Sequence, residues 1–206
     1  MNTQKLKEAE YRFLQSYPGG FNHPEMAAIG KKHKMPQMVE FAQEHFDKRA
    51  FSDPEDVADS MVKLVSRASM VSLFEKPKFR DAVKSMDVNT RTALVTALKK
   101  LLHGNQRQGF EALVELLRPL KLAKWSLVTI LPNYYRPDDE VFVKPTTAKG
   151  VIDYFEIEGL QYKPQPTWDF YSAYRDVFLQ MKAQVDPLLR PNNAAFGGFL
   201  MMTVRP

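Results

Sequence analysis

The side chains best suited to holding a ligand lie in an aromatic, proline-rich stretch of the chain. Six of the eight tyrosines and both tryptophans fall between residues 125 and 174. Loops interrupted by proline leave planar side chains partly available, and an arginine beside an exposed ring can stack on a base or clamp a carboxylate or phosphate. We predict that five aromatic and basic residues form a binding site: Lys124, Tyr134, Tyr135, Arg136 and Lys144.

Part of this aromatic surface is expected to be structural. Large rings dominate the interiors of folded proteins, so we expect Trp125, Phe142 and Trp168 in the core. Tyr134 and Tyr135 are neighbours on an irregular segment, where successive side chains point apart. One of these two rings is therefore predicted to enter the core while the other stays outside.

The acidic and basic residues around position 140 match the pattern of a metal-dependent nuclease only in part. Such an enzyme needs two acids on adjoining strands to hold Mg²⁺, with a lysine close to the attacked phosphate. Asp138 would be the first acid and Glu140 the second, but Lys144 follows Glu140 by four residues, whereas the pattern requires two. Gln161 and Lys163 have the required spacing, but Gln161 supplies no acid. Turn and hairpin chemistry explains these residues more simply than catalysis does.

Other motifs for catalysis or cofactor binding are missing from the sequence. There is no cysteine, which excludes disulfides and thiolate chemistry, and no glycine-rich phosphate loop or serine-nucleophile signature. The four histidines are scattered, and none is paired at helical spacing as in a zinc motif. We therefore predict no metal site and no cofactor, and we favour a protein that is not an enzyme. The histidines stand at positions 23, 33, 45 and 103.

The positive charge of the chain gives limited support to nucleic-acid binding. The net charge is +5 and the isoelectric point is near 9.3. Residues 119–206 hold ten Lys or Arg against nine Asp or Glu, so most of the excess lies in residues 1–118. A platform for single strands needs basic and aromatic residues interleaved. Non-specific contact with a nucleic-acid backbone is the form of binding that remains.

No part of the sequence predicts a membrane partner. No apolar run approaches the length that spans a bilayer, and the N-terminal residues are polar and lack the apolar core of a signal peptide. With 44% hydrophobic and 26% charged residues, the chain has the composition of an ordinary soluble protein. We expect a cytoplasmic location. The sequence leaves the oligomeric state open.

The spacing of apolar residues predicts helices through most of the chain. Proline, glycine and capping residues mark their ends, as Ser52, Asp53 and Pro54 do at one start and Gly104 does at one stop. We expect helices at about residues 3–16, 24–32, 36–48, 53–74, 78–86, 90–103, 110–117, 125–131, 147–154, 167–185 and 194–202. Alternating residues predict short strands at 140–144 and 160–163.

This order of elements predicts a mainly α fold: a single-domain, bundle-like arrangement of helices with a minor two-stranded β insert at about 140–163. The chain forms one domain, residues 1–206, for which a division into a helical lobe, 1–118, and an aromatic and proline-rich α+β lobe, 119–206, is the alternative. The last helix is so apolar that it must be buried, either in its own core or against another subunit.

These observations favour a non-enzymatic binding or adaptor module. Its partner would be either nucleic acid, bound non-specifically, or another protein. The alternative is an enzyme, a hydrolase or metal-dependent nuclease, whose site is assembled from dispersed acidic and basic residues. Salt-dependent binding of nucleic acid would favour the first, and a deep pocket with converging acids would favour the second.

Overall fold

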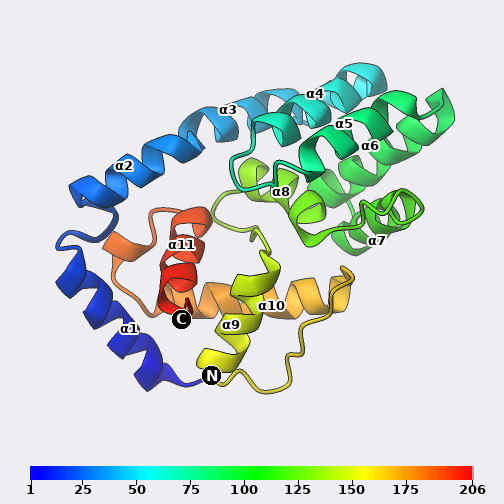
Figure 1. The fold of residues 1–206 in the computed structure, drawn as a ribbon. Helices are drawn as coiled ribbons and strands as arrows, with labels where there is room; N and C mark the ends of the chain where they lie inside the picture. The colour runs from blue at the N-terminus through cyan, green and yellow to red at the C-terminus, as the bar shows by residue number, and fades with distance from the viewer. Residues whose placement is uncertain (206) are drawn as a thin grey trace.

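The computed structural model describes residues 1–205, which form helices joined by loops (Figure 1). Three short 3-10 helices, Gly20–Asn22, Ala50–Ser52 and Pro187–Leu189, lie in the connections. The mainly α prediction is confirmed. The α-helices are α1 (Thr3–Ser16), α2 (Pro24–His33), α3 (Met35–His45), α4 (Pro54–Arg67), α5 (Glu75–Ser85), α6 (Val88–His103), α7 (Gln106–Leu117), α8 (Trp125–Tyr135), α9 (Pro145–Tyr154), α10 (Trp168–Ala183) and α11 (Asn193–Thr203).

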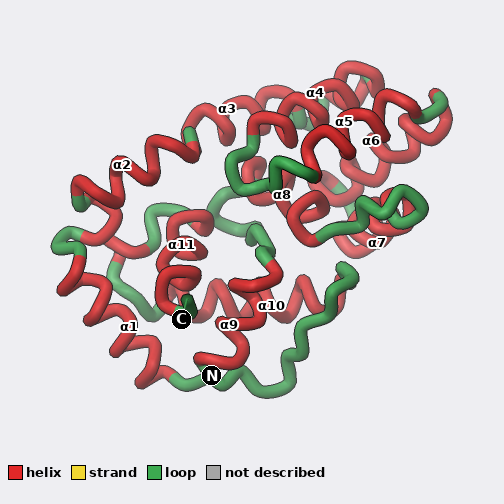
Figure 2. Tube along the Cα trace, in the orientation of Figure 1, coloured by secondary structure: helices red, strands yellow, loops and turns green. Residues whose placement is uncertain are grey.

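The predicted two-stranded insert at 140–163 is wrong, since residues 1–205 contain no strand (Figure 2). In the segment after α8, Val141 and Val143 are buried, Phe142 is half-buried and Lys144 is exposed, although Glu140 is buried as well. The amides of this segment, however, bond to helix side chains. The Val143 amide donates to Thr129 Oγ1 at 3.0 Å, and the Val141 amide donates to the Tyr171 hydroxyl at 3.3 Å. The alternating apolar residues of this segment are therefore buried between helices and do not pair with a second strand.

The second expected strand, 160–163, is a loop for a similar reason. The carbonyl of Lys163 accepts a hydrogen bond from the indole Nε1 of Trp125 at 2.8 Å. Trp125 begins α8 and is buried, as predicted. The Lys163 carbonyl is thus satisfied by a core side chain, and it does not need a strand partner.

Side-chain caps set several helix starts. Asp53 accepts from the amides of Glu55 and Asp56 at the start of α4, and Pro54 occupies the first turn. At α6 the cap is Asp87, which accepts from the Thr90 amide at 2.9 Å, so the helix begins at Val88, before the predicted start at residue 90. Capping oxygens satisfy amides that have no partner inside the helix, which fixes where the chain turns.

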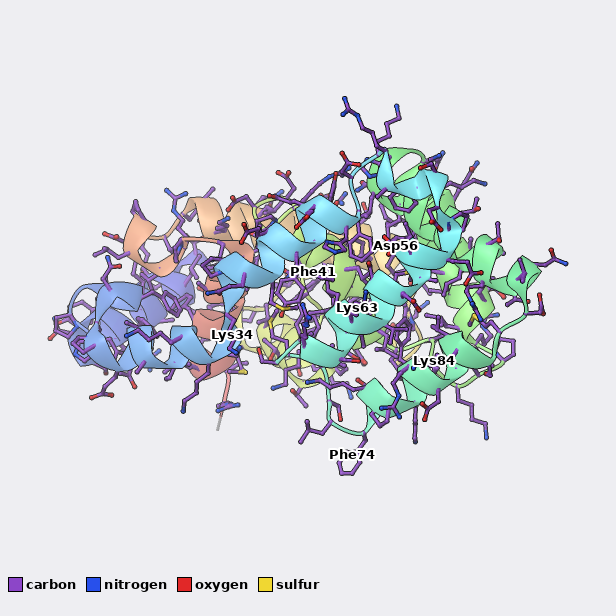
Figure 3. All side chains as sticks on the ribbon, turned by 90° about the horizontal axis from the view of Figure 1, so that it is seen from above. Lys34, Phe41, Asp56, Lys63, Phe74 and Lys84 are labelled. Atoms are coloured by element: carbon purple, nitrogen blue, oxygen red, sulfur yellow. The ribbon has the colours of Figure 1, made fainter. Side chains whose placement is uncertain are left out.

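Helix α4 ends earlier than the sequence predicts. It stops at Arg67, and Ala68 is already extended, whereas the apolar stripe predicted a helix reaching about residue 74. The loop that follows leaves Leu73 and Phe74 about 80% exposed. Figure 3 shows Phe74 standing clear of the ribbon at the edge of the molecule.

The helices pack around one continuous core. Helices α2, α3 and α4 follow one another along one edge, α5, α6 and α7 gather at one end, and α10 runs along the opposite side (Figure 1). Gly109 of α7 lies so close to α6 that a Cβ there would stand 2.2 Å from the Leu101 nitrogen. This approach packs α6 directly on α7.

Helix α1 packs on elements from the other end of the chain. The Asn2 amide donates to the Phe155 carbonyl at 2.7 Å, and Lys5 pairs with Glu156 at 2.6 Å. Phe13 meets Phe199 of α11 edge to face, with ring centroids 5.4 Å apart. A helix of residues 1–118 therefore lies against residues 119–206. The division into two lobes at that boundary stays a prediction.

A buried carboxylate connects the helices that surround the centre of the molecule. Glu140, 2% exposed, follows α8 and accepts from Tyr171 and Gln106, each at 2.6 Å. Arg175 of α10 reaches both carboxylate oxygens, at 3.1 and 3.2 Å. The backbone carbonyl of Glu140 accepts from Asn193 of α11 at 2.9 Å. One residue thus links α7, α10 and α11 to the end of α8.

Removing this carboxylate is expected to destabilise the fold strongly. Glu140→Ala leaves Arg175, Tyr171 and Gln106 without their shared acceptor, and breaking a buried ion pair costs about 3–5 kcal/mol. Asp138→Ala is the control, because Asp138 pairs with Lys182 but is 68% exposed, and such pairs contribute less than about 1 kcal/mol. Urea unfolding measures both losses. Equal losses for the two variants would contradict the role of Glu140.

Candidate functional site

The predicted binding residues around α8 do not gather at one point. Lys124 precedes α8, whereas Tyr135 ends it and Arg136 follows. An α-helix of this length separates its two ends by about 16 Å. Lys144, exposed at the start of α9, belongs to a different surface, described below. Ligand binding by the five residues together stays a prediction.

Tyr134 enters the core, as predicted for one of the two rings, but both residues lie in the last turn of α8 and not on an irregular segment. Tyr134 has no exposed surface, and burial raises the pKa of its hydroxyl to about 12, with Ser69 opposing that rise in part. Tyr135 is half-buried and meets the His103 ring edge to face, at a centroid distance of 5.3 Å. Arg136 donates to the Leu102 carbonyl and lies 3.8 Å from Glu140, so its guanidinium already has partners within the protein.

The residues weighed as nuclease ligands also have structural partners. Glu140 is enclosed by hydrogen-bond donors, and Asp138 pairs with Lys182 at 3.1 Å. Within residues 1–205, no three His, Asp or Glu side chains lie close enough to share a metal ion. The acids near position 140 therefore act in packing and ion pairing.

An apolar pocket lies where α2 and α3 face α11. Its volume is about 580 Å³. Helix α2 ends at His33, and Lys34 turns the chain into α3 with a positive φ of 48°, a bend that Figure 3 shows at the labelled Lys34. Residues on both sides of this bend line one wall of the pocket, and residues 191–202 line another. The bend and α11 therefore define the space.

Apolar side chains make up most of the lining. Five methionines take part, and methionine adapts its shape to irregular apolar ligands. The apolar lining consists of Phe21, Met26, Ala27, Ile29, Met35, Pro36, Met70, Phe142, Phe178, Pro191, Ala194, Ala195, Met201 and Met202.

Small residues on one side of α11 leave room for the pocket. Gly197 and Gly198 line it, and a Cβ at either would meet nothing nearer than 3.8 Å. The opposite side of the same helix sends Phe196, Phe199 and Leu200 into the core. The sequence predicts burial of the whole helix, in its own core or against another subunit. Its large residues are buried in the core, while its small residues and Met201 face the pocket.

Polar groups are few and carry no negative charge. No Asp or Glu of the described chain lines the pocket, whereas Lys144 and Arg205 do. The hydroxyl-bearing residues Thr147 and Tyr174 also line the wall, and they are 8% and 3% exposed. Neither hydroxyl forms a hydrogen bond with any residue from 1 to 205, and burial raises the pKa of Tyr174 well above its usual value.

A histidine and a serine meet on the pocket wall. His33 Nδ1 lies 2.8 Å from Ser69 Oγ, and both residues line the pocket. A serine nucleophile needs such a base, and the base in turn needs a third group that orients it. Across the described residues, the other ring nitrogen of His33 has no hydrogen-bond partner. The contact ties the end of α2 to the loop after α4.

Two features of the sequence belong to this pocket, but they do not identify it. Lys144 is one of the predicted binding residues, and the last helix is predicted to be unusually apolar. Met26, Met35 and Met70 come from separate segments, so their convergence depends on the bend at Lys34. Only the folded chain places them together.

Comparison with known proteins found no matching family model, no matching curated protein and no matching solved structure. Among the helices described, none is both long enough and apolar enough to cross a membrane.

Burial of Tyr134 predicts a loss of stability in alkali. A tyrosine has a pKa near 10 in the unfolded chain, so the folded chain, in which that pKa is about 12, holds the proton more tightly. The resulting stability is fully present below pH 10 and is lost as the pH rises through 12.

Replacing Tyr134 by phenylalanine should reduce this loss. Between pH 7.5 and pH 11, the free energy of unfolding should fall by about 1 kcal/mol less in Tyr134→Phe than in the parent protein. The control is Tyr11→Phe, since Tyr11 is 64% exposed. Urea unfolding at both pH values provides the measurement. Identical losses in the parent and in Tyr134→Phe would show that the buried hydroxyl does not produce the effect.

Proposed function

We propose that this protein is a non-enzymatic binding protein that holds a small apolar molecule in the pocket between α2, α3 and α11. The pocket itself is the observation that carries the proposal. Its volume of about 580 Å³ lies in the range of sites for small molecules, which are lined mainly by apolar side chains with a few polar groups. Spaces between helices are a common location for such sites.

The lining supports binding more than catalysis. Methionine and phenylalanine side chains exclude water and gain free energy when an apolar molecule replaces it, at about 25 cal/mol for each Å² of apolar surface removed from water. Acids that could act as a general acid and base are absent from the lining within residues 1–205. The pocket therefore provides affinity and contains few groups that could drive a reaction.

A hydrolase remains the alternative, on the evidence of a single contact. His33 and Ser69 are within hydrogen-bond distance at the pocket, as a base and a nucleophile would be. Ser69 lies in the loop after α4, and His33 at the end of α2 has no partner in the described chain to orient its ring. This dyad lacks the third group on which serine nucleophiles depend.

The two partner classes suggested by the sequence have less support than a small molecule. Arg136 already donates to the Leu102 carbonyl and lies 3.8 Å from the Glu140 carboxylate, which offsets part of its charge toward a phosphate. Tyr134 is buried and offers no ring for a base to stack on. Leu73 and Phe74 are exposed apolar residues that a protein could contact, but they form a small pair and not a groove.

Titration with the neutral, environment-sensitive dye Nile red tests the proposal. We expect saturable binding of one dye per protein, with a rise in fluorescence. Gly197→Leu should weaken binding about tenfold or more, because the added side chain fills the space beside α11. The fold should survive, since leucine favours a helix more than glycine does and a Cβ at this position is free of clashes.

The matched control adds the same bulk outside the pocket. Ala183 is an exposed residue at the end of α10 and does not line the pocket, so Ala183→Leu should leave the dissociation constant within about twofold of the parent value. Failure of the parent protein to bind the dye saturably would contradict the proposal. Equal effects of Gly197→Leu and Ala183→Leu would place the dye elsewhere on the protein.

A further inference from the structure

The end of the pocket formed by α9 and the residues after α11 carries two cations that have no acidic partner. Lys144 Nζ lies 3.5 Å from Met201 Sδ, and Arg205 Nη2 lies 3.6 Å from the same sulfur. Neither cation forms an ion pair with any residue of the described chain. Two positive charges therefore converge on one side chain of the pocket wall.

Close packing of α9 on the Val204 side chain holds the two cations near each other. Gly150 of α9 packs on Val204, where a Cβ would stand 2.7 Å from Val204 Cγ2. This contact brings the chain beyond α11 against α9. Arg205 is the next residue after Val204, and Lys144 lies directly before α9. The arrangement is therefore set by packing and not by the flexible side chains alone.

Two hydroxyl-bearing residues of the same pocket form no side-chain hydrogen bond within the described chain. Thr147 lies one turn of α9 beyond Lys144, and Tyr174 lies on α10. Both side chains are more than nine-tenths buried and line the pocket. Because these hydroxyls have no protein partner, each can donate a hydrogen bond to a ligand oxygen that enters the pocket.

We propose that the ligand is a single-chain amphiphile with a carboxylate head, held by Lys144 and Arg205 with its apolar tail among the methionines. This inference rests on the proposed function and adds the chemistry of the head group. Arginine presents parallel donors that match a carboxylate, and lysine adds a point charge. The lining contains no acid that would repel such a head. A cationic or neutral head would leave both cations unpaired.

Competition against bound Nile red at pH 7.5 tests the head group. Decanoate should displace the dye with an affinity about tenfold higher than that of decanol, which has the same tail without the charge. Decylammonium should bind more weakly than decanol, because it meets two cations. Acetate should not compete, since it has no tail. High salt should reduce the advantage of decanoate.

A double variant identifies the groups responsible. Lys144→Met/Arg205→Met keeps the length and apolar character of both side chains, and it should bring decanoate to within about threefold of decanol. Lys149→Met is the matched control, because Lys149 is exposed on α9 and does not line the pocket. It should preserve the tenfold preference.

The outcomes separate this inference from the proposed function. Binding of Nile red and decanol with no preference for decanoate would overturn the carboxylate assignment and leave the apolar pocket standing. A preference for decanoate that persists in the double variant would overturn the assignment of Lys144 and Arg205. Absence of binding by dye, decanol and decanoate alike would overturn both proposals. The comparison of decanoate with decanol on the parent protein is decisive even if the double variant fails to fold.

Discussion

The fold depends on the burial of one negative charge. Glu140 is 2% exposed, and a carboxylate removed from water in this way is tolerated only when donors surround it. Tyr171, Arg175 and Gln106 supply those donors, from α10 and α7. Since Tyr171 and Arg175 come from one helix and Gln106 from another, the carboxylate is satisfied only when α7 and α10 are correctly arranged around it. Asn193 extends the same network to the start of α11, through the Glu140 carbonyl.

This network also explains why a pocket can persist beside a well-packed core. Asn193 fixes the first turn of α11, and the large residues of that helix, Phe196 and Phe199, enter the core. The opposite side of α11 is left with glycine, alanine and methionine, facing α2 and α3 across the pocket. Because the core side of α11 is anchored, the opposite side of this helix can border the pocket. At the other end of α11, Gly150 of α9 packs on the Val204 side chain and holds that end of the helix in place.

The sequence predicted the helices well because their periodicity and caps are local properties. Asp53 with Pro54 marked the start of α4, and the last helix, predicted at 194–202, is α11, Asn193–Thr203. The strand prediction failed at Val141 and Val143, where alternation arises from burial between helices. The pocket could not be predicted because it requires the bend at Lys34. This residue has a φ of 48°, and a lysine in the sequence does not indicate a positive φ. Of the predicted site residues, Lys144 alone lines the pocket.

The most direct test of a small-molecule pocket follows the methyl groups of the ten methionines by NMR during a titration with decanoate. We expect large shifts at the five that line the pocket, namely Met26, Met35, Met70, Met201 and Met202. Met38, Met61 and Met181 are buried elsewhere and should shift little. Shifts confined to methionines outside the pocket, or no saturable shifts at all, would contradict the account.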